Sequence, residues 1–481
     1  MRLLLLPAIV ALSACSMTPD LVRPAPPVPA VFPDTPRGDA PADGSDASDA
    51  SHASHVSDIG WRAMFRDPRL QGLIERALAN NRDLRLATLN VAAVQAQFRV
   101  QRAAQWPGVV AEHGMRRERS PRRDDALSAV VEQHGVGVGL SAFEIDLFGR
   151  MRALSDAAAS RYLASDEGRR AAQIALVGAV ASAYLAERLA YEQRCLAERT
   201  LADWRESLRL AHLLRQAHQN SGLDVTQATG QVADAEAAVE ARQRALAQAG
   251  NALRLLVGAE PPAALPEALP LDAQPVLTRL PPGLPAALLH ARPDIRQAEQ
   301  ALVAANADIG AARAAFFPRI SLTASLGYAS PALGALFQAD HRLWRFSPQI
   351  AQPLFQGGRL RAELRLAEVR KSEAVAQYEQ AIQIAFREVA DGLAGSATYE
   401  RQLDARTRAV ASAERRMHLV HLHYRAGQYD RLALLDAQRR LYGERQALLN
   451  LRHAAFGNAV TLYKALGGGL IENMSSDDTP R

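Results

Sequence analysis

The chain has 481 residues, enough for a large hydrophobic core, but aromatic residues make up only 5% of it. Its abundance of alanine and arginine suits long helices with narrow packing seams rather than a core of aromatic rings. The net charge of +5 is mild for this length and no basic block stands out, so nucleic-acid binding is not expected. The two cysteines, Cys15 and Cys195, exclude a disulfide framework and a cysteine-type metal motif.

Residues 1–14 have the pattern of a secretory signal peptide. Arg2 precedes an apolar run that is too short to span a bilayer as a helix, and Leu12-Ser13-Ala14 then lead into Cys15. This stretch resembles the lipobox of bacterial lipoproteins, which implies that Cys15 is lipidated and becomes the new N-terminus. Ser16 follows in place of an aspartate that would resemble an inner-membrane retention signal, so the resemblance implies the outer membrane.

Residues 15–60 predict an extended, partly disordered tether, because they are rich in proline, serine and aspartate without apolar periodicity. His52 and His55 are interpreted as exposed residues of this tether. Ordered structure is expected from Trp61.

Residues 61–257 predict helix, strand, strand, long helix and returning helix. The strands are expected at about 107–116 and 134–147, with the charged stretch 116–125 as a loop in water. The long helix from about 150 to 220 would span on the order of 100 Å at ~1.5 Å per residue. Ser221-Gly222-Leu223-Asp224 is the expected turn. Cys195 lies in an apolar helical run and is interpreted as a small packing residue.

The second half repeats this plan after a proline-rich linker at 258–285. In residues 286–466 the strands are expected at about 318–329 and 343–354, and a long helix follows from about 358 to 425. The last helix ends near 466, and residues 467–481 are expected to be a loose C-terminal tail.

The two halves are copies of one pattern. Asp83 and Pro107 match Asp294 and Pro318, each 211 positions later, and Leu147-Phe148-Gly149-Arg150 matches Leu354-Phe355 with Gly358-Arg359. Between the matched aspartate and proline, apolar residues recur in heptads, which predicts helices that pack lengthwise against other helices. A duplicated fold therefore accounts for the length.

The four expected strands have the length of transmembrane β-strands. Four strands cannot close a barrel, and open edges in lipid would leave backbone groups without hydrogen bonds. Either the strands are soluble or several chains contribute to one barrel.

A set of motifs in order along the chain now identifies a family. They are Cys15-Ser16-Met17-Thr18-Pro19-Asp20, Arg23-Pro24, Phe65-Arg66-Asp67-Pro68-Arg69-Leu70, Ala79-Asn80-Asn81-Arg82-Asp83-Leu84, Asp146-Leu147-Phe148-Gly149-Arg150, Ala291-Arg292-Pro293-Asp294-Ile295 and Leu435-Asp436-Ala437-Gln438. Over nearly its whole length the chain resembles the outer-membrane factor family of TolC-like proteins, in its lipoprotein branch.

The resemblance implies a mainly α-helical chain that forms a homotrimer, with a 12-stranded transmembrane β-barrel on a long periplasmic α-barrel. It implies a lipid-anchored exit duct of a tripartite drug efflux system in the cell outer membrane. The implied partners are outer-membrane lipid, a periplasmic membrane-fusion adaptor and an inner-membrane RND-type transporter. A duct for type I protein secretion remains an alternative, as does a periplasmic structural coiled-coil protein, although the latter leaves the strands unexplained.

The resemblance also implies a gate at the turn after the second long helix. The matched constriction residues are Leu432 and Asp436, which share a helix face because they are four apart. Three copies would give an apolar plug and an acidic ring. Tyr424 belongs to the same motif, and His423 stands where an arginine commonly precedes that tyrosine. His423 therefore puts one family salt bridge in doubt and raises the hypothesis of pH-dependent closure.

No motif of an enzyme or a cofactor site is found. The sequence has no glycine-rich phosphate loop, nucleophile pair or carboxylate pair at catalytic spacing. His418, His421 and His423 cluster near a helix end, but no cysteine or carboxylate completes a metal shell with them. Neither an enzymatic activity, nor a cofactor, nor a metal is expected.

Overall fold

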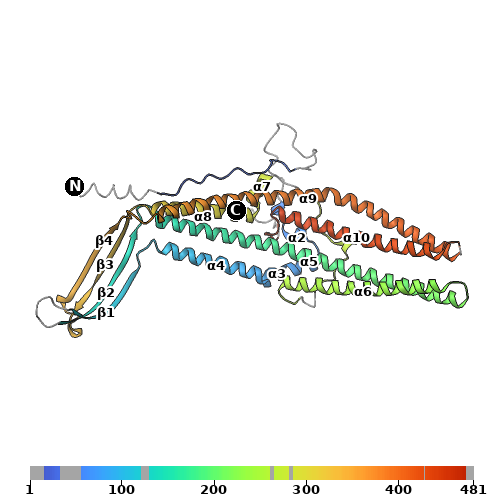
Figure 1. The fold of residues 1–481 in the computed structure, drawn as a ribbon, viewed down its shortest axis with the longest axis horizontal. Coiled ribbons are helices and arrows are strands. Elements are labelled where there is room, and N and C mark those ends of the chain that lie inside the picture. The colour runs from blue at the N-terminus through green and yellow to red at the C-terminus, as the bar shows by residue number, and fades with distance from the viewer. Residues whose placement is uncertain are drawn as a thin grey trace, which may run out of the picture. The chain divides into compact units, whose positions relative to one another are not determined.

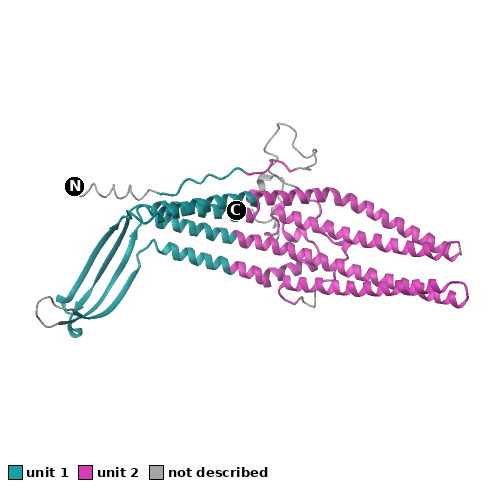
Figure 2. Ribbon diagram, viewed as in Figure 1, with its two compact units in different colours: residues 1–25, 89–166, 297–380 teal, residues 26–88, 167–296, 381–481 magenta. Residues whose placement is uncertain are grey.

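The computed structural model describes residues 16–32, 56–120, 129–260, 265–280, 285–426 and 428–472 (Figure 1). The expected signal segment, Cys15, His52 and His55 lie outside the described residues. The chain forms two compact units (Figure 2). Unit 1 comprises residues 1–25, 89–166 and 297–380, and unit 2 comprises residues 26–88, 167–296 and 381–481.

Unit 1 carries one antiparallel sheet of four strands in the order β1-β2-β3-β4. The strands are β1 (Val109–Ser120), β2 (Ala129–Ile145), β3 (Arg319–Ser330) and β4 (Arg342–Ala351). The expected four strands are thus confirmed. The expectation of a loop from residue 116 onward is wrong as far as Ser120, because each residue from Arg116 to Ser120 pairs with a residue of β2. Charges also pair along this ladder, as Arg117 does with Glu132 at 3.8 Å.

The register gathers the apolar side chains on one face of the sheet. Val138 of β2 pairs with Leu326 of β3, which pairs with Trp344 of β4. Directly paired residues of antiparallel strands point to the same face. These three side chains are 52%, 52% and 72% exposed. The sheet therefore presents an uncovered apolar face, while glycine, serine and threonine of β2 and β3 occupy much of the other.

An irregularity in β2 preserves this alternation near the strand end. The register shifts between Leu140 and Phe143, and Ala142 takes a left-handed conformation with φ of 49°. The Ala142 backbone N–H donates to Oγ1 of Thr323 at 3.1 Å. The shift is a β-bulge, and it keeps Phe143 opposite Leu322 on the apolar face.

The two heptad helices differ in burial. They are α4 (Arg82–Ala103) and α8 (Pro293–Ala314). In α8 the seam residues Ile295 and Leu302 are 1% exposed, whereas no residue of α4 is buried. The seam of α4 is only partly buried, with Phe98 stacked on Tyr162 of α5, and Leu86, Leu89 and Val100 on its other side are 64%, 56% and 73% exposed.

Residues 16–25 of unit 1 lie extended on α8. Asn306 donates a side-chain hydrogen bond to the Pro19 carbonyl at 2.7 Å, and Arg23 pairs with Glu299 at 2.7 Å. Gly310 leaves room for this segment, because a Cβ atom there would collide with Thr18. The start of the expected tether is thus packed on a helix.

Two helices of 67 residues run on from unit 1 into unit 2. They are α5 (Arg150–Gln216) and α9 (Arg359–Arg425). Each turns back in unit 2, into α6 (Gly222–Val257) and α10 (Arg431–Ala465), and both turns lie at the same end of that unit (Figure 1). The remaining elements are short, namely η2 (Val56–Asp58), α2 (Trp61–Met64), α3 (Pro68–Asn80), η3 (Leu271–Ala273), α7 (Pro285–Ala291), η4 (Leu333–Ala335) and η5 (Ala339–His341).

The core of unit 2 forms where α2 and α3 meet the long helices. Asp67 caps α3 by accepting from the Arg69 backbone N–H, and its other oxygen accepts from the Tyr184 hydroxyl at 2.6 Å. Burial and the charge of Asp67 raise the pKa of Tyr184. Tyr463 is buried edge-on against Phe65 and donates to the Ile59 carbonyl at 2.6 Å. Both hydroxyl groups are therefore satisfied inside the core.

The expectation of a loose tail is wrong for residues 467–472. The backbone N–H groups of Trp61 and Arg62 donate to the carbonyls of Ile471 and Glu472 at 3.0 and 3.4 Å. The first N–H groups of a helix have no partner within the helix, so this segment supplies the acceptors that α2 needs. Residues 473–481 lie outside the described residues.

Candidate functional site

The turn between α9 and α10 is built around a helix cap. Asp430 has an extended conformation, and its side chain accepts from the Ala433 backbone N–H at 2.9 Å. This cap starts α10, so that Leu432 stands in its first turn and Asp436 one turn later. The Leu432 side chain is 70% exposed.

Asp436 forms an ion pair across the hairpin. Its Oδ2 atom lies 2.6 Å from Nη2 of Arg416 on α9, and both side chains remain more than half exposed. The acidic ring stays a prediction, and within the single chain the Asp436 carboxylate already has a cationic partner. The spacing along the sequence does not show this partner. The pair forms only because the antiparallel hairpin brings α9 and α10 side by side.

Tyr424 and His423 have different surroundings although they are neighbours in sequence. Tyr424 packs on a small core of Val420, Leu434 and Ala437, which joins α9 to α10. His423 is exposed, with Nδ1 2.6 Å from Oε1 of Gln428 and its ring 5.0 Å from that of Tyr429. Tyr424 thus holds the hairpin together, and His423 contacts the turn.

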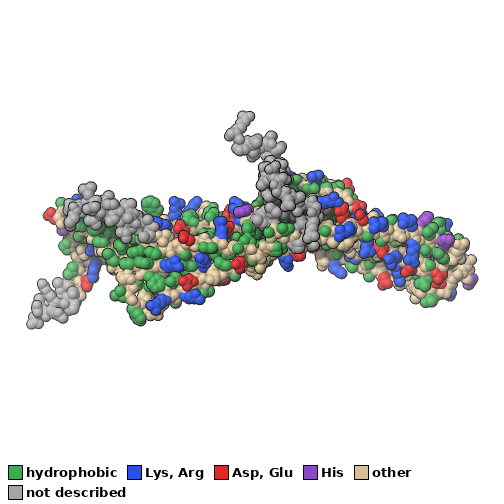
Figure 3. Space-filling view, turned by 90° about the horizontal axis from the view of Figure 1, so that it is seen from above, with side chains coloured by type: hydrophobic (Ala, Val, Ile, Leu, Met, Phe, Trp, Pro, Cys, Tyr) green, Lys and Arg blue, Asp and Glu red, His purple; other side chains and the backbone are tan. Residues whose placement is uncertain are grey.

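His418 and His421 complete the histidine cluster on α9. Figure 3 shows histidine and charged side chains of both signs at the hairpin end of unit 2. Within the described ranges, no group of three or more histidine, cysteine, aspartate or glutamate side chains is arranged to hold a metal ion.

The second hairpin, α5–α6, ends in a capping box. The Ser221 side chain accepts from the Asp224 backbone N–H, and Asp224 in turn accepts from the Ser221 backbone. The hydrogen bond from the Ser221 backbone, then that from its hydroxyl, lowers the pKa of Asp224, and the nearby charge of Arg431 on α10 acts in the same direction. Arg431 therefore links the two hairpins electrostatically.

An apolar cluster also joins the two hairpins, and sequence reasoning missed it. Leu201 and Trp204 of α5 pack with Ala235 of α6 and Leu435 of α10. Leu435 stands between the two expected gate residues. Leu435 is 5% exposed, and its partners on α5 are set by tertiary packing.

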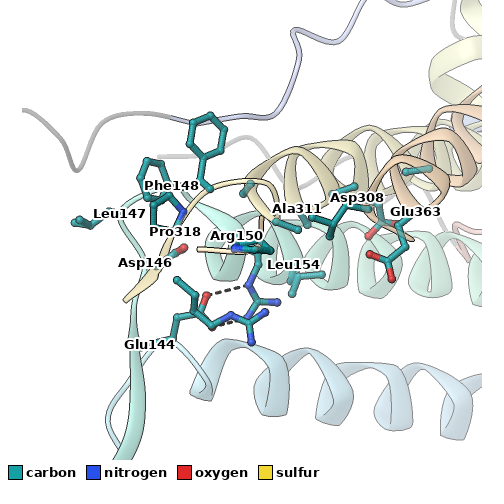
Figure 4. Close-up of a pocket in the computed structure, with 18 of the residues that line it drawn as sticks. Glu144, Asp146, Leu147, Phe148, Arg150, Leu154, Asp308, Ala311, Pro318 and Glu363 are labelled. Carbon is teal, nitrogen blue, oxygen red and sulfur yellow. Dashed lines mark hydrogen bonds and ion pairs between the residues drawn. The ribbon is translucent and has the colours of Figure 1, made fainter. Parts of the chain in front are cut away.

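In unit 1, the motif that begins at Asp146 forms the connection between β2 and α5, and its residues have structural roles there. Asp146 accepts from the Arg152 backbone N–H at 2.8 Å, and Gly149 has φ of 73°, which favours glycine. Arg150 donates two hydrogen bonds, of 2.9 and 2.6 Å, to the Glu144 carboxylate. Figure 4 shows this pair at the wall of a cavity of about 680 Å³. The motif thus fixes a strand to the start of a long helix.

The corresponding joint in the second half is more open. Phe148 stacks on Phe317 with ring centroids 4.8 Å apart, whereas Leu354 and Phe355 are 92% and 89% exposed. Gly357 and Gly358 have φ of 56° and 88° in this turn. The duplication therefore keeps the turn chemistry and leaves the second apolar pair uncovered within the chain.

Known proteins resemble this chain over nearly its whole length. The family model described as outer membrane efflux protein matches residues 73–259 and 284–468. The probable efflux pump outer membrane protein TtgC of Pseudomonas putida is 42% identical, covering 98% of this chain and 97% of the relative. The cation efflux system protein CusC of Escherichia coli is 40% identical, covering 95% of this chain and 96% of the relative.

Solved structures agree with this match. A crystal structure of CusC gives a TM-score of 0.83 at 38% identity, covering 95% of this chain and all of that one. The open state of the MtrE outer membrane channel of Neisseria gonorrhoeae gives a TM-score of 0.85 at 37% identity, covering 96% of this chain and all of that one. With its two repeats, four antiparallel strands and paired long helices, the chain belongs to the outer membrane efflux protein family.

Proposed function

We propose that this protein is the passive exit duct of a tripartite efflux pump that exports drugs or other small toxic compounds. The observation that carries the proposal is the sheet of unit 1. It is an open sheet with an exposed apolar face, and such edges are stable in lipid only when strands of other chains close them.

The proposed assembly is a homotrimer, in which three sheets form one 12-stranded barrel. The exposed apolar side chains of Leu86, Leu89 and Val100 on α4 support a neighbouring chain alongside this helix. A periplasmic membrane-fusion adaptor and an inner-membrane RND-type transporter complete the proposed pump. The names of TtgC and CusC as efflux pump components support these partners.

The cargo is tested in the native host. A deletion of the gene should increase sensitivity to toluene and to several unrelated antibiotics, and the wild-type gene on a plasmid should restore resistance. Unchanged sensitivity, together with loss of one secreted protein from the culture medium, would contradict drug efflux and favour type I protein secretion. The assay needs no assumption about where the duct closes.

Anchoring is a separate proposal. We infer that Cys15 carries acyl chains, because it follows the lipobox-like Leu12-Ser13-Ala14. One acyl chain alone binds a membrane only weakly, so several chains and the barrel together would make attachment stable.

Labelling with a tagged fatty acid tests the anchor. The wild type should incorporate label and Cys15→Ser should not, while Cys195→Ser, which changes the other cysteine, should label normally. Label retained in Cys15→Ser would refute the assignment.

A further inference from the structure

Two cavities lie between α6 and α10 near the hairpin end of unit 2. One has a volume of about 330 Å³ and lies beside Leu432 and Asp436. The other has about 270 Å³ and reaches α5. Gln231, Asp234 and Arg439 line both cavities, which therefore adjoin and are together called the α6–α10 pocket below.

Gln231 gives this pocket an unused hydrogen-bond acceptor. The residue is 8% exposed, and its Oε1 atom has no hydrogen-bond partner among the described residues. A buried amide oxygen without a donor is costly and uncommon in native proteins. A ligand that brings an N–H group would satisfy it.

Two opposite charges stand at the mouth of the pocket without partners. Asp234 on α6 and Arg439 on α10 both line it, and neither forms an ion pair within the described part of the chain. Nearby carboxylates behave differently, since Glu236 pairs with Arg205 and Asp436 with Arg416. Asp234 and Arg439 are therefore available to charged groups of a ligand in the pocket.

The walls of the pocket suit a flat ring. Trp204 of α5, which is 7% exposed, lines it, and so does Tyr442 of α10. Ala235 and Ala238 of α6 leave space between them, because their side chains are small. Apolar walls with a few convergent polar groups are typical of small-molecule sites.

We propose that the α6–α10 pocket binds a small aromatic zwitterion. The ring lies against Trp204, and the ammonium group donates to Gln231 Oε1 and faces Asp234. The carboxylate of the ligand faces Arg439. Because the ligand contacts both helices, it holds α6 against α10. The binding claim is independent of the proposed function, whereas the effect on the gate rests on it.

Binding is tested on the full-length protein in detergent, with 6-(aminomethyl)-2-naphthoic acid as the probe. Titration calorimetry gives the affinity, and the change in tryptophan fluorescence reports on the ring near Trp204. The comparison ligands are 2-naphthylmethylamine, 2-naphthoic acid and 2-naphthalenemethanol, which carry only the cation, only the anion and no charge. The zwitterion should bind most tightly and the neutral alcohol most weakly.

Three variants separate the contributions. Asp234→Asn should weaken the binding of the zwitterion and of the amine about tenfold or more and leave the affinity for the acid unchanged. Arg439→Gln should weaken the binding of the zwitterion and of the acid and leave the affinity for the amine unchanged. Gln231→Leu should weaken the binding of the zwitterion and of the amine. Asp234 and Arg439 are exposed, so their variants should fold, and unchanged elution and helical circular dichroism verify this.

Glu236→Gln is the matched control, because Glu236 is an exposed carboxylate on the same helix that does not line the pocket. It should bind the probe as the wild type does. Equal binding of all four ligands, or affinities that neither charge variant changes, would overturn the site and indicate only partition into apolar surface.

The clamping effect is tested separately in planar bilayers. At saturating probe the conductance of the wild type should fall, and that of the Asp234→Asn, Arg439→Gln double variant should not. Unchanged wild-type conductance despite measured binding would overturn the clamp and leave the binding site in place.

Discussion

Arg292 is a buried cation that joins several parts of unit 2. Its guanidinium donates to Asp294 and to Glu388 at 2.6 and 2.7 Å, and also to the Ala465 carbonyl at 3.1 Å. Burial lowers the pKa of Arg292, but the hydrogen bonds and charges of Asp294 and Glu388 outweigh it, so the pKa is raised. The arginine stays charged and ties α8, α9 and α10 together.

Replacing Arg292 should destabilise the protein strongly. Arg292→Met should cost about 3 kcal/mol, because it removes the cation of a buried network while both carboxylates remain partly hydrated. Arg205→Met is the control, since the exposed Arg205–Glu236 pair should contribute less than about 1 kcal/mol. The thermal unfolding midpoint in detergent should fall clearly only for Arg292→Met. Equal midpoints for the two variants would contradict the role of Arg292.

At the level of elements, the two faces of the sheet determine which substitutions the proposed barrel would tolerate. Leu322 pairs with Phe143 on the apolar face, whereas Thr323 points to the other face. An arginine on the lipid face of a barrel costs about 2–4 kcal/mol at mid-bilayer. Leu322→Arg should therefore reduce the yield of trimers from membranes much more than Thr323→Arg. Similar trimer yields for both would show that the apolar face does not meet lipid.

Much of this element structure is predictable from the sequence. Alternation after Pro318 predicts β3, and the absence of proline and scarcity of glycine predict the two long helices. The extent of β1 is not predictable, because its last five residues are charged or polar and depend on pairing with β2. The ordered conformation of residues 467–472 is not predictable from the sequence either, because it depends on hydrogen bonds from the first N–H groups of α2.

The candidate gate, too, is predictable from the sequence only in part. Leu432 and Asp436 follow from a motif, and their shared face follows from helix geometry. The Arg416–Asp436 pair and the Trp204–Leu435 contact depend on how the hairpins pack, which no local pattern encodes. The α6–α10 pocket is invisible in the sequence for the same reason.

For the whole molecule, the open edges of the sheet and the exposed apolar side chains of α4 both favour closure by copies of the chain. The chain is part of an efflux system and not an enzyme, so its function depends on when the assembled duct is open. An apolar Leu432 and a paired Asp436 at one helix end provide the proposed barrier. Because Arg416 offsets the charge of Asp436, three copies would repel one another less than three free carboxylates.

The most direct test is the conductance of the full-length protein in planar bilayers. The wild type should conduct little, and the double variant Leu432→Ala, Asp436→Ala should give a severalfold larger, steady conductance. Leu419→Ala with Glu414→Ala is the control, because it removes an exposed leucine and an ion-paired carboxylate elsewhere in the same hairpin. That control should conduct like the wild type. If the Leu432, Asp436 variant forms normal trimers and conducts no more than the wild type, the duct does not close at this turn.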